Sequence, residues 1–269
     1  MKTITILVSV TITLVLLVWL GLQIKPKPFS SYQSVAADPK TNPLPDGLPA
    51  PVKRFYNLVY GDTVPVIETA VISGRGSMRV KGITFPARFR FSHIPGQDYH
   101  HYIEATIFSL PLMKVNEWYV DGKSRLELPF GVSEGIKVDQ GANLALWAEA
   151  IWMPSVWITD TQVRWEPIDE HSARLVAPFG DEEEHITVRF DPHTGMLRTM
   201  ESMRYKESDS PQKTLWLNEV LEWTALNGRM LPIVTSITWQ DEGTPWAVFT
   251  TEEVVYNVDI QAAALVGSD

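Results

Sequence analysis

Beyond residue 60, apolar and polar side chains alternate with a period of two, a pattern that few structures other than a β-sheet accept. The clearest run spans Ile83 to Phe91, where apolar residues alternate with threonine, proline and arginine. Successive side chains of a strand point to opposite faces, so this run predicts a strand with one buried and one solvated face. Pro86 cannot donate to a ladder, so the strand is expected at an edge or with a bulge.

The same alternation recurs along the rest of the chain, and turn signals such as Asn227-Gly228 separate the segments. Short turns favour the pairing of consecutive strands, and therefore an antiparallel sheet. Few helical patterns lie between the strands, which argues against an α/β architecture. We therefore predict a mainly β fold with a strongly curved antiparallel sheet, either a half-barrel or an open barrel. The further segments are 66–80, 98–108, 115–120, 124–128, 162–166, 173–177, 184–190, 196–205, 214–225, 230–240 and 246–258.

The segment from Asp139 to Trp157 departs from this alternation and predicts a helix that ends or kinks at Pro154. Leucine, tryptophan, isoleucine and methionine lie on all sides of its axis, so the helix should be buried on several sides. We expect it to plug or cover the concave face of the sheet. A short helix is predicted over residues 48–60, with Pro49 and Pro51 in its first turn.

Glu149 is the one charged residue between Ala142 and Trp157, so its carboxylate must be paired, protonated or near solvent. One interpretation is a polar group at the mouth of an aromatic-lined apolar pocket. The alternative is an exposed edge or a structural bond to an arginine, with the aromatic residues forming plain core. The predicted pocket-lining residues are Trp147, Trp152, Trp157, Phe89 and Phe91.

The segment from Thr3 to Ile24 contains no charged side chain, and its length matches the hydrocarbon core of a bilayer. A transmembrane signal anchor at residues 1–24 is the favoured interpretation, with residues 3–24 contacting lipid. A cleaved signal peptide and a buried core helix are the alternatives. An anchor at this position predicts a single-pass protein of the cell membrane whose C-terminal domain lies outside the cytoplasm.

The rest of the chain is expected to form one domain behind a linker. Residues 25–47 are rich in proline, and that composition predicts an extended tether that holds the domain off the bilayer. No comparable linker interrupts the later sequence, so residues 48–260 are expected to form a single β domain. Residues 261–269 are expected to be a C-terminal tail.

Composition and motifs exclude several classes of function. The net charge is -9 and no stripe of Lys and Arg occurs, which argues against nucleic acid as a partner. The chain has no cysteine, so disulfides and thiolate sites are absent. Catalytic elbows, phosphate loops and the H-E-x-x-H zinc motif were not found either. The sequence therefore predicts no catalytic residue, no metal site and no cofactor.

One polar group stands out, because Asp98, His100 and Glu104 share one face of a strand by period two. Two of these side chains could bind an ion or share a proton, whereas the alternative is an ordinary solvated face. His101 points to the opposite face and is interpreted as a satisfied core histidine. His93 follows the end of a predicted strand, and the sequence provides no evident partner for either.

Five short motifs lie along the predicted domain: 48–52 (LPAPV), 76–79 (GSMR), 147–154 (WAEAIWMP), 163–166 (VRWE) and Phe190-Asp191 with Gly195. Together they resemble a bacterial family of membrane-associated proteins whose function is unknown. The resemblance covers roughly residues 48–258 and implies a fold rather than an activity. The sheet with its plugging helix is also similar to the half-barrels of periplasmic lipoprotein carriers, at the level of fold alone.

Three functions are compatible with these features. The first is a membrane-anchored binding module for a lipid or another apolar ligand, because a curved sheet around an apolar helix forms a concave, aromatic-lined cavity. The second is a structural or interaction domain of the cell envelope, which would bind a protein partner through a sheet edge or its tryptophans. The third is a hydrolase with His100, Glu104 or Glu149 as acid or base.

Overall fold

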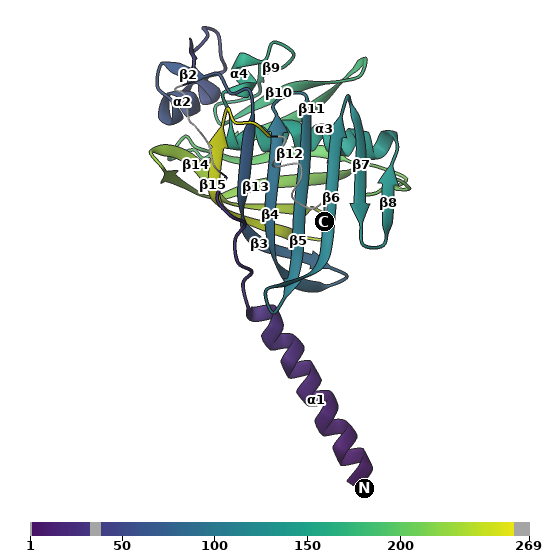
Figure 1. The fold of residues 1–269 in the computed structure, drawn as a ribbon. Helices are drawn as coiled ribbons and strands as arrows, with labels where there is room; N and C mark the ends of the chain where they lie inside the picture. The colour runs from purple at the N-terminus through teal and green to yellow at the C-terminus, as the bar shows by residue number, and fades with distance from the viewer. Residues whose placement is uncertain (1, 33–38, 261–269) are drawn as a thin grey trace.

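The alternating segments form one antiparallel sheet of thirteen strands in the computed structural model, which describes residues 2–32 and 39–260 (Figure 1). The sheet consists of two meanders, β3 to β8 and β9 to β15, which meet where β15 pairs with β3. Strands β8 and β9 form the two edges, so the sheet is an open half-barrel. The predicted mainly β, antiparallel fold is confirmed.

The strands of the first meander are β3 (Ala70–Val80), β4 (Ile83–Ile94), β5 (Asp98–Ile107), β6 (Leu110–Val120), β7 (Lys123–Leu128) and β8 (Gly131–Glu134). The strands of the second are β9 (Arg164–Pro167), β10 (Ser172–Phe179), β11 (Glu182–Phe190), β12 (Leu197–Arg204), β13 (Thr214–Leu226), β14 (Arg229–Trp239) and β15 (Pro245–Tyr256). A separate pair consists of β1 (Thr41–Pro43) and β2 (Thr63–Pro65).

The expectation that Pro86 marks an edge or a bulge is wrong. Strand β4 lies between β3 and β5, and its register with both neighbours is regular. The pairing of β4 with β5 begins at Ala87, immediately after the proline. Proline has no backbone N–H group to donate, and at Pro86 the ladder between β4 and β5 has not yet begun, so no hydrogen bond to β5 is lost.

Two glycines in β3 allow the two meanders to approach at a sharp bend. A Cβ atom added at Gly74 would overlap the carbonyl oxygen of Thr250, and one at Gly76 would overlap that of Val248. Both carbonyls belong to β15, the partner strand across the junction. Glycine inside a strand commonly marks such a close approach, and here it allows the sheet to bend around the buried helix.

The predicted apolar helix occupies the concave face of the sheet. It consists of α3 (Ile136–Glu149), a single 3₁₀ turn η1 (Ala150–Trp152) and the short helix α4 (Val156–Thr159). Pro154 separates η1 from α4, as expected for a residue that interrupts a helix. Helix α3 contacts β6, β7 and β8 of one meander and β10, β11 and β12 of the other. Every residue from Asp139 to Glu149 is buried.

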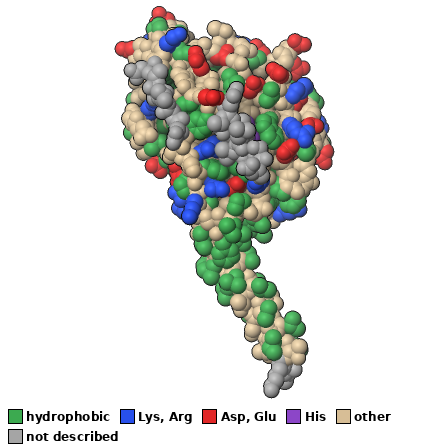
Figure 2. All heavy atoms as spheres, in the orientation of Figure 1, with side chains coloured by type: hydrophobic (Ala, Val, Ile, Leu, Met, Phe, Trp, Pro, Cys, Tyr) green, Lys and Arg blue, Asp and Glu red, His purple; other side chains and the backbone are tan. Residues whose placement is uncertain are grey.

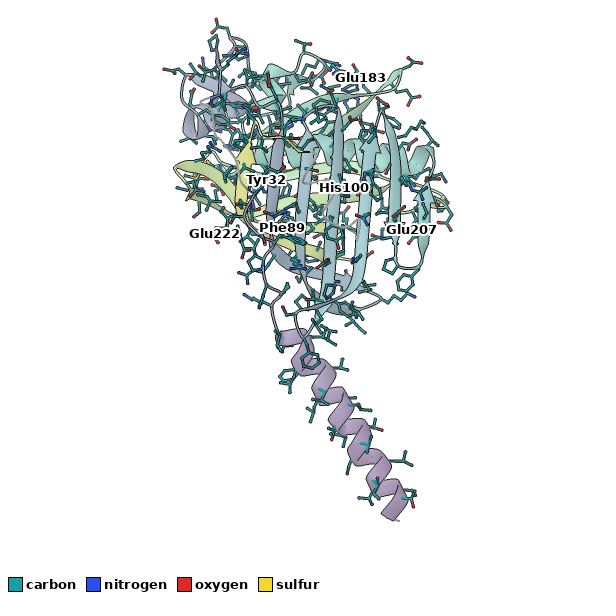
Figure 3. The ribbon with its side chains drawn as sticks, in the orientation of Figure 1. Tyr32, Phe89, His100, Glu183, Glu207 and Glu222 are labelled. Carbon is teal, nitrogen blue, oxygen red and sulfur yellow. The ribbon has the colours of Figure 1, made fainter. Side chains whose placement is uncertain are left out.

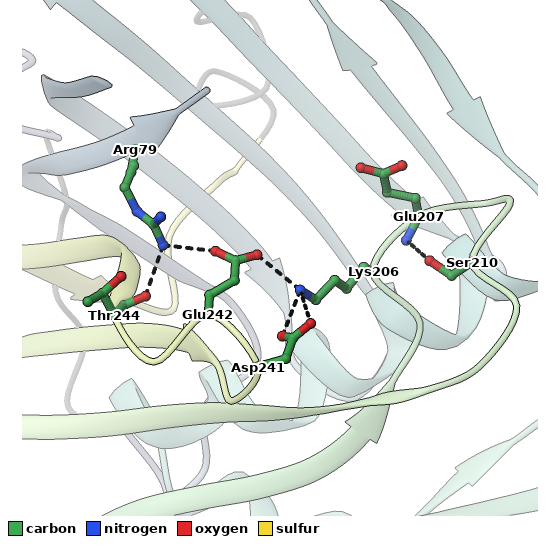
Figure 4. Close-up of polar contacts among 7 residues, drawn as sticks. All are labelled: Arg79, Lys206, Glu207, Ser210, Asp241, Glu242 and Thr244. Atoms are coloured by element: carbon green, nitrogen blue, oxygen red, sulfur yellow. Dashed lines mark hydrogen bonds and ion pairs between the residues drawn. The ribbon is translucent and has the colours of Figure 1, made fainter. Parts of the chain in front are cut away.

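An ion-pair network joins the loops at one end of the two meanders (Figure 4). Arg79 at the end of β3 lies 2.8 Å from Glu242 in the β14–β15 turn. Lys206, beyond β12, lies 3.0 Å from Glu242 and 2.7 Å from Asp241. These partly exposed charges hold β3, the β12–β13 loop and the β14–β15 turn together.

The N-terminal helix α1 (Lys2–Gln23) projects from one end of the sheet, whereas α2 (Ala50–Val59) lies near the opposite end (Figure 1). Residues 3–20 are all exposed, so the alternative of a buried core helix is wrong. The span Thr3–Gln23 is long and apolar enough to cross a membrane. Residues 33–38 of the predicted tether and the predicted tail at 261–269 lie outside the described residues.

The chain that follows α1 runs along the outer face of the sheet. Arg88 donates to the carbonyl of Lys27, and Arg90 donates to the carbonyl of Ser30. The backbone N–H of Tyr32 donates to the carboxylate of Glu253 on β15, at 3.0 Å (Tyr32 is labelled in Figure 3).

Replacing Gly76 with alanine should therefore destabilise the protein by about 3 kcal/mol, because the new Cβ atom has no space beside β15. The matched control is Ser77→Ala at the next position, which adds no atom and should change stability by less than about 0.5 kcal/mol. Urea unfolding of the full chain in detergent, followed by tryptophan fluorescence, measures both. Equal unfolding midpoints for the two variants would show that the junction does not require glycine.

Candidate metal centre

Two histidines face the concave side of the sheet from adjacent strands. In β4 the inward positions continue from Phe89 and Phe91 to His93, and in β5 they include His101. His101 is paired with Phe91, so it is a diagonal neighbour of His93, and their ring centroids are 5.4 Å apart. Both side chains are buried, and His93 has no exposed surface at all.

Glu149, the last residue of α3, completes this group. Its Oε2 atom lies 2.7 Å from His101 Nε2 and 3.5 Å from His93 Nε2. The alternative of an exposed edge or a bond to an arginine is not what the structure shows, because Glu149 is buried and its charged neighbours are the two histidines. One ligand atom from each of the three residues lies within 4.8 Å of the others.

The facing atoms of this cluster lack hydrogen bonds. Within the described part of the chain, both ring nitrogens of His93, Nε2 of His101 and Oε2 of Glu149 have no hydrogen-bond partner. His101 Nε2 and Glu149 Oε2 nevertheless form an ion pair at 2.7 Å. Buried polar atoms almost always have a partner, so the two ring nitrogens of His93, which accept and donate no hydrogen bond, require an explanation.

The pKa values of the two histidines diverge. Burial lowers the pKa of His93 well below its usual value, and the charge of His101 lowers it further. Burial by itself would also lower the pKa of His101, but the carboxylates of Glu149 and Glu117 raise it to about 9. At neutral pH the metal-free cluster therefore contains a neutral His93 and a protonated His101.

Glu117 on β6 lies next to His101, on the other side of its ring from Glu149. Its Oε2 atom lies 3.6 Å from His101 Nδ1, and its other oxygen accepts a hydrogen bond from the Tyr99 hydroxyl at 2.9 Å. Burial by itself would raise the pKa of Glu117, but His101, Arg204 and Tyr99 together lower it. The Tyr99 ring stacks on the imidazole of His101 with 3.9 Å between the ring centroids, so the orientation of the imidazole is restricted.

A cleft of about 430 Å³ opens on the side of the cluster where Glu117 lies. Its walls include Lys137, Arg204 and Lys206, together with Gly141 of α3. Arg204 packs over the ring of Trp216, with 4.9 Å between the guanidinium carbon and the ring centroid. Glu117 therefore lies between this cleft and the buried histidines.

The predicted polar strand cluster lies on the opposite, outer face of β5, and each of its residues has a different partner. Asp98 accepts a hydrogen bond from the backbone of Asp121. His100 contacts Asn116 at 3.2 Å and stacks on Trp118 (His100 is labelled in Figure 3).

Glu104, the third member of that cluster, pairs with Arg88 at 2.6 Å and accepts a hydrogen bond from Tyr102 at 2.6 Å. Because Asp98, His100 and Glu104 each have a different partner, they do not form a shared ion or proton site. Their predicted role as a ligand group has no further support in this geometry.

The predicted pocket-lining aromatic residues all belong to the buried core, three of them on the segment from α3 to α4 and two on β4. Trp157 donates from its indole to the carbonyl of Trp147 at 2.9 Å, and Trp152 donates to that of Pro232 at 3.2 Å. The rings of Phe89 and Phe91 contact each other, with 4.8 Å between their centroids. In this structure the five side chains form core, and a ligand would have to displace neighbouring side chains to reach them.

The cluster was missed in the sequence because the predicted strand that begins at Ile83, β4 in the structure, ended at Phe91. The period-two pattern continues to His93, two positions further on the same face. The signal that could have identified it was the combination of inward histidines on both strands of one hairpin with the lone carboxylate of an otherwise apolar helix.

Comparisons with known proteins identify a family and several distant structural matches. A DUF1329 family protein from Desulfovibrio piger has 12% sequence identity and a TM-score of 0.43, covering 81% of this chain and 95% of its own. A LolA superfamily protein from Nitrosomonas europaea has 8% identity and a TM-score of 0.44, covering 79% of this chain and 94% of its own.

The search of curated protein sequences found no match. The model of a family of unknown function, DUF6544, matches residues 39–251. That match includes the sheet from β3 to most of β15, the plugging helix and all three residues of the His–Glu cluster. The chain therefore belongs to the DUF6544 family, in agreement with the family of unknown function expected from its motifs.

Proposed function

We propose that this protein is a membrane-anchored, extracytoplasmic binding module that holds a divalent transition-metal ion between His93, His101 and Glu149. The observation that carries the proposal is the set of buried ring nitrogens and carboxylate oxygen that face one another without hydrogen bonds. A bound cation would satisfy one ring nitrogen of each histidine together with the carboxylate oxygen. The anchoring part of the proposal is supported by the exposed apolar span Thr3–Gln23.

The donor atoms favour zinc or a neighbouring first-row metal over calcium or magnesium. Two imidazoles and one carboxylate are a common ligand set for zinc and for non-haem iron, whereas calcium and magnesium prefer all-oxygen sites. A tetrahedral ion at roughly 2.0–2.1 Å from each donor separates the donors by about 3.3 Å. The distances from Glu149 to the histidines, 2.7 and 3.5 Å, bracket that value, and all three ligand atoms lie within 4.8 Å of one another, so the side chains would have to draw together around the ion.

The surroundings suit a metal site as well. Ligand histidines usually direct their second nitrogen to a carboxylate, which fixes the ring and increases its basicity. Glu117 is placed to do this for His101, and Tyr99 holds Glu117 in turn. Three protein ligands leave one coordination position for water or a further group. In this proposal Glu149 acts as a ligand, and the ion connects the end of α3 to β4 and β5.

An apolar ligand is the second candidate, and a specific cleft favours it. Val59 and Tyr60 at the end of α2, together with Leu231 and Tyr256, line a partly enclosed space of about 240 Å³. The Tyr256 hydroxyl donates to the carbonyl of Trp152, so this cleft lies directly beside the aromatic core. Lipid or another small apolar molecule bound there would make the protein a carrier or sensor of that ligand.

Native mass spectrometry of the full chain in detergent distinguishes the two ligands by mass. The metal proposal predicts that chelator-treated protein regains one zinc ion per chain, and that His93→Gln, His101→Gln and Glu149→Gln each weaken zinc binding by about 100-fold or more. Zinc should also raise the melting temperature of the wild-type chain, because an ion bound to the folded state alone stabilises it.

The matched control is His100→Gln, because His100 lies beside His101 in the chain but faces outward. This variant should bind zinc as the wild type does. The metal proposal is contradicted if folded wild-type protein takes up no ion, or if His100→Gln loses as much affinity as His101→Gln. A co-purified lipid mass that disappears when Tyr256 or Leu231 is replaced would instead support the apolar-ligand candidate.

Zinc binding should release about one proton per ion at neutral pH. His101 is protonated below its pKa of about 9 and must lose that proton to bind a cation, whereas His93 is already neutral. Apparent affinity should therefore rise about tenfold per pH unit between roughly pH 6.5 and 8. Isothermal calorimetry in buffers of different ionisation enthalpy counts the protons, and a value of zero would contradict this arrangement.

A further inference from the structure

The hairpin that connects β5 to β6 exposes a group of large apolar side chains. Phe108, Leu110 and Leu112 are 44%, 67% and 55% exposed. From Ile107 to Met113 the one polar residue is Ser109, and its hydroxyl accepts a hydrogen bond from the backbone of Lys27. Monomeric proteins rarely expose such a contiguous apolar patch to water, so the tip is expected to contact another apolar phase.

This hairpin tip is joined directly to the end of α1. The backbone N–H of Phe108 donates to the carbonyl of Gly21 at 2.9 Å. A Cβ atom at position 21 would lie 2.7 Å from both Ile107 and Phe108, so the helix and the tip are in close contact. Gly21 lies inside the span Thr3–Gln23, and each helical residue rises about 1.5 Å. A side chain packed against Gly21 therefore lies at the level of the membrane surface rather than above it.

Two further hairpin tips extend the apolar surface at the same end of the sheet. Ile83 follows the β3–β4 turn and is 51% exposed, and Phe130 in the β7–β8 turn is 71% exposed. Lys81 lies over the Phe130 ring at 4.8 Å, so these two tips are in contact. In Figure 2 hydrophobic side chains continue from the helix onto the base of the domain without interruption.

In the segment after α1 and in the β3–β4 and β5–β6 hairpins, the charges have the sign that anionic lipid attracts. Residues 20–32, 79–91 and 105–116 contain no Asp or Glu, although the whole chain has a net charge of -9. The same segments contain Lys25, Lys27 and Lys81, all exposed. Lysines beside apolar side chains that enter the headgroup region are the usual composition of a membrane-surface contact.

We propose that the β5–β6 hairpin tip inserts into the bilayer beside α1, so that the base of the domain rests on the lipid surface. The inserted side chains are Phe108, Leu110 and Leu112, and Lys25, Lys27 and Lys81 contact the headgroups. The occupant is lipid rather than a protein, because the tip is fixed to the helix at the depth of the membrane surface. This replaces the expectation that residues 25–47 hold the domain off the bilayer.

Single-cysteine labelling tests this placement, because the chain has no native cysteine. Leu110→Cys carries an environment-sensitive fluorophore, and the full chain is reconstituted into phosphatidylcholine–phosphatidylglycerol vesicles containing nitroxide-labelled lipid. The proposal predicts a blue-shifted emission and a loss of at least about half of the fluorescence to the nitroxide. The matched control is Leu58→Cys in α2, which is 52% exposed but lies at the end of the domain away from α1 (Figure 1). Its label should remain unquenched.

A label at Leu14→Cys reports on α1 itself and separates the failure of the anchor from the failure of the contact. Quenching at positions 14 and 110 but not 58 is the expected result. Quenching at 14 alone would overturn the proposal while leaving the anchor intact. A blue shift at position 110 without lipid quenching would mean that protein covers the tip, and no quenching at 14 would remove the anchor on which the proposal rests.

Discussion

The burial of an apolar helix by a single sheet is the constraint on which the rest of this structure depends. Helix α3 is buried around its circumference from Asp139 to Glu149, and one flat sheet could cover only one of its sides. The sheet therefore curls until strands of both meanders contact α3. The close approach of β15 to Gly74 and Gly76 permits the bend at the centre. A carboxylate carried into that interior needs a partner, and Glu149 meets two histidines there.

The same arrangement supports the proposed cation over a simple ion pair. A Glu149–His101 pair satisfies the charge of the carboxylate but leaves both nitrogens of His93 without partners. A divalent ion would use one nitrogen from each ring, while Glu117 would balance part of the added charge. Because Glu149 ends α3 and the histidines belong to β4 and β5, the ion would also fix the helix to the sheet.

Most of the fold could be predicted from the sequence, since period-two alternation and the apolar helix are local patterns. Strand β8 was missed because Val132 is its one large apolar side chain, so no alternation is visible in it. Pro86 was misplaced because a central strand tolerates proline where the neighbouring ladder stops. The cluster could not be predicted in full, because His93 and Glu149 meet only after the sheet has folded around α3. The interpretation of His101 as a satisfied core histidine also depended on a partner that is distant in the sequence.

X-ray absorption spectroscopy at the zinc edge, on zinc-loaded full chain in detergent, tests the central claim most directly. The account predicts a four-coordinate ion with two imidazole nitrogens and one carboxylate oxygen at roughly 2.0–2.2 Å, together with the multiple-scattering pattern of two histidine rings. In the His93→Gln variant the pattern should be reduced to that of one ring. A wild-type spectrum without imidazole scattering, or one unchanged by that substitution, would contradict the assignment of the metal to this cluster.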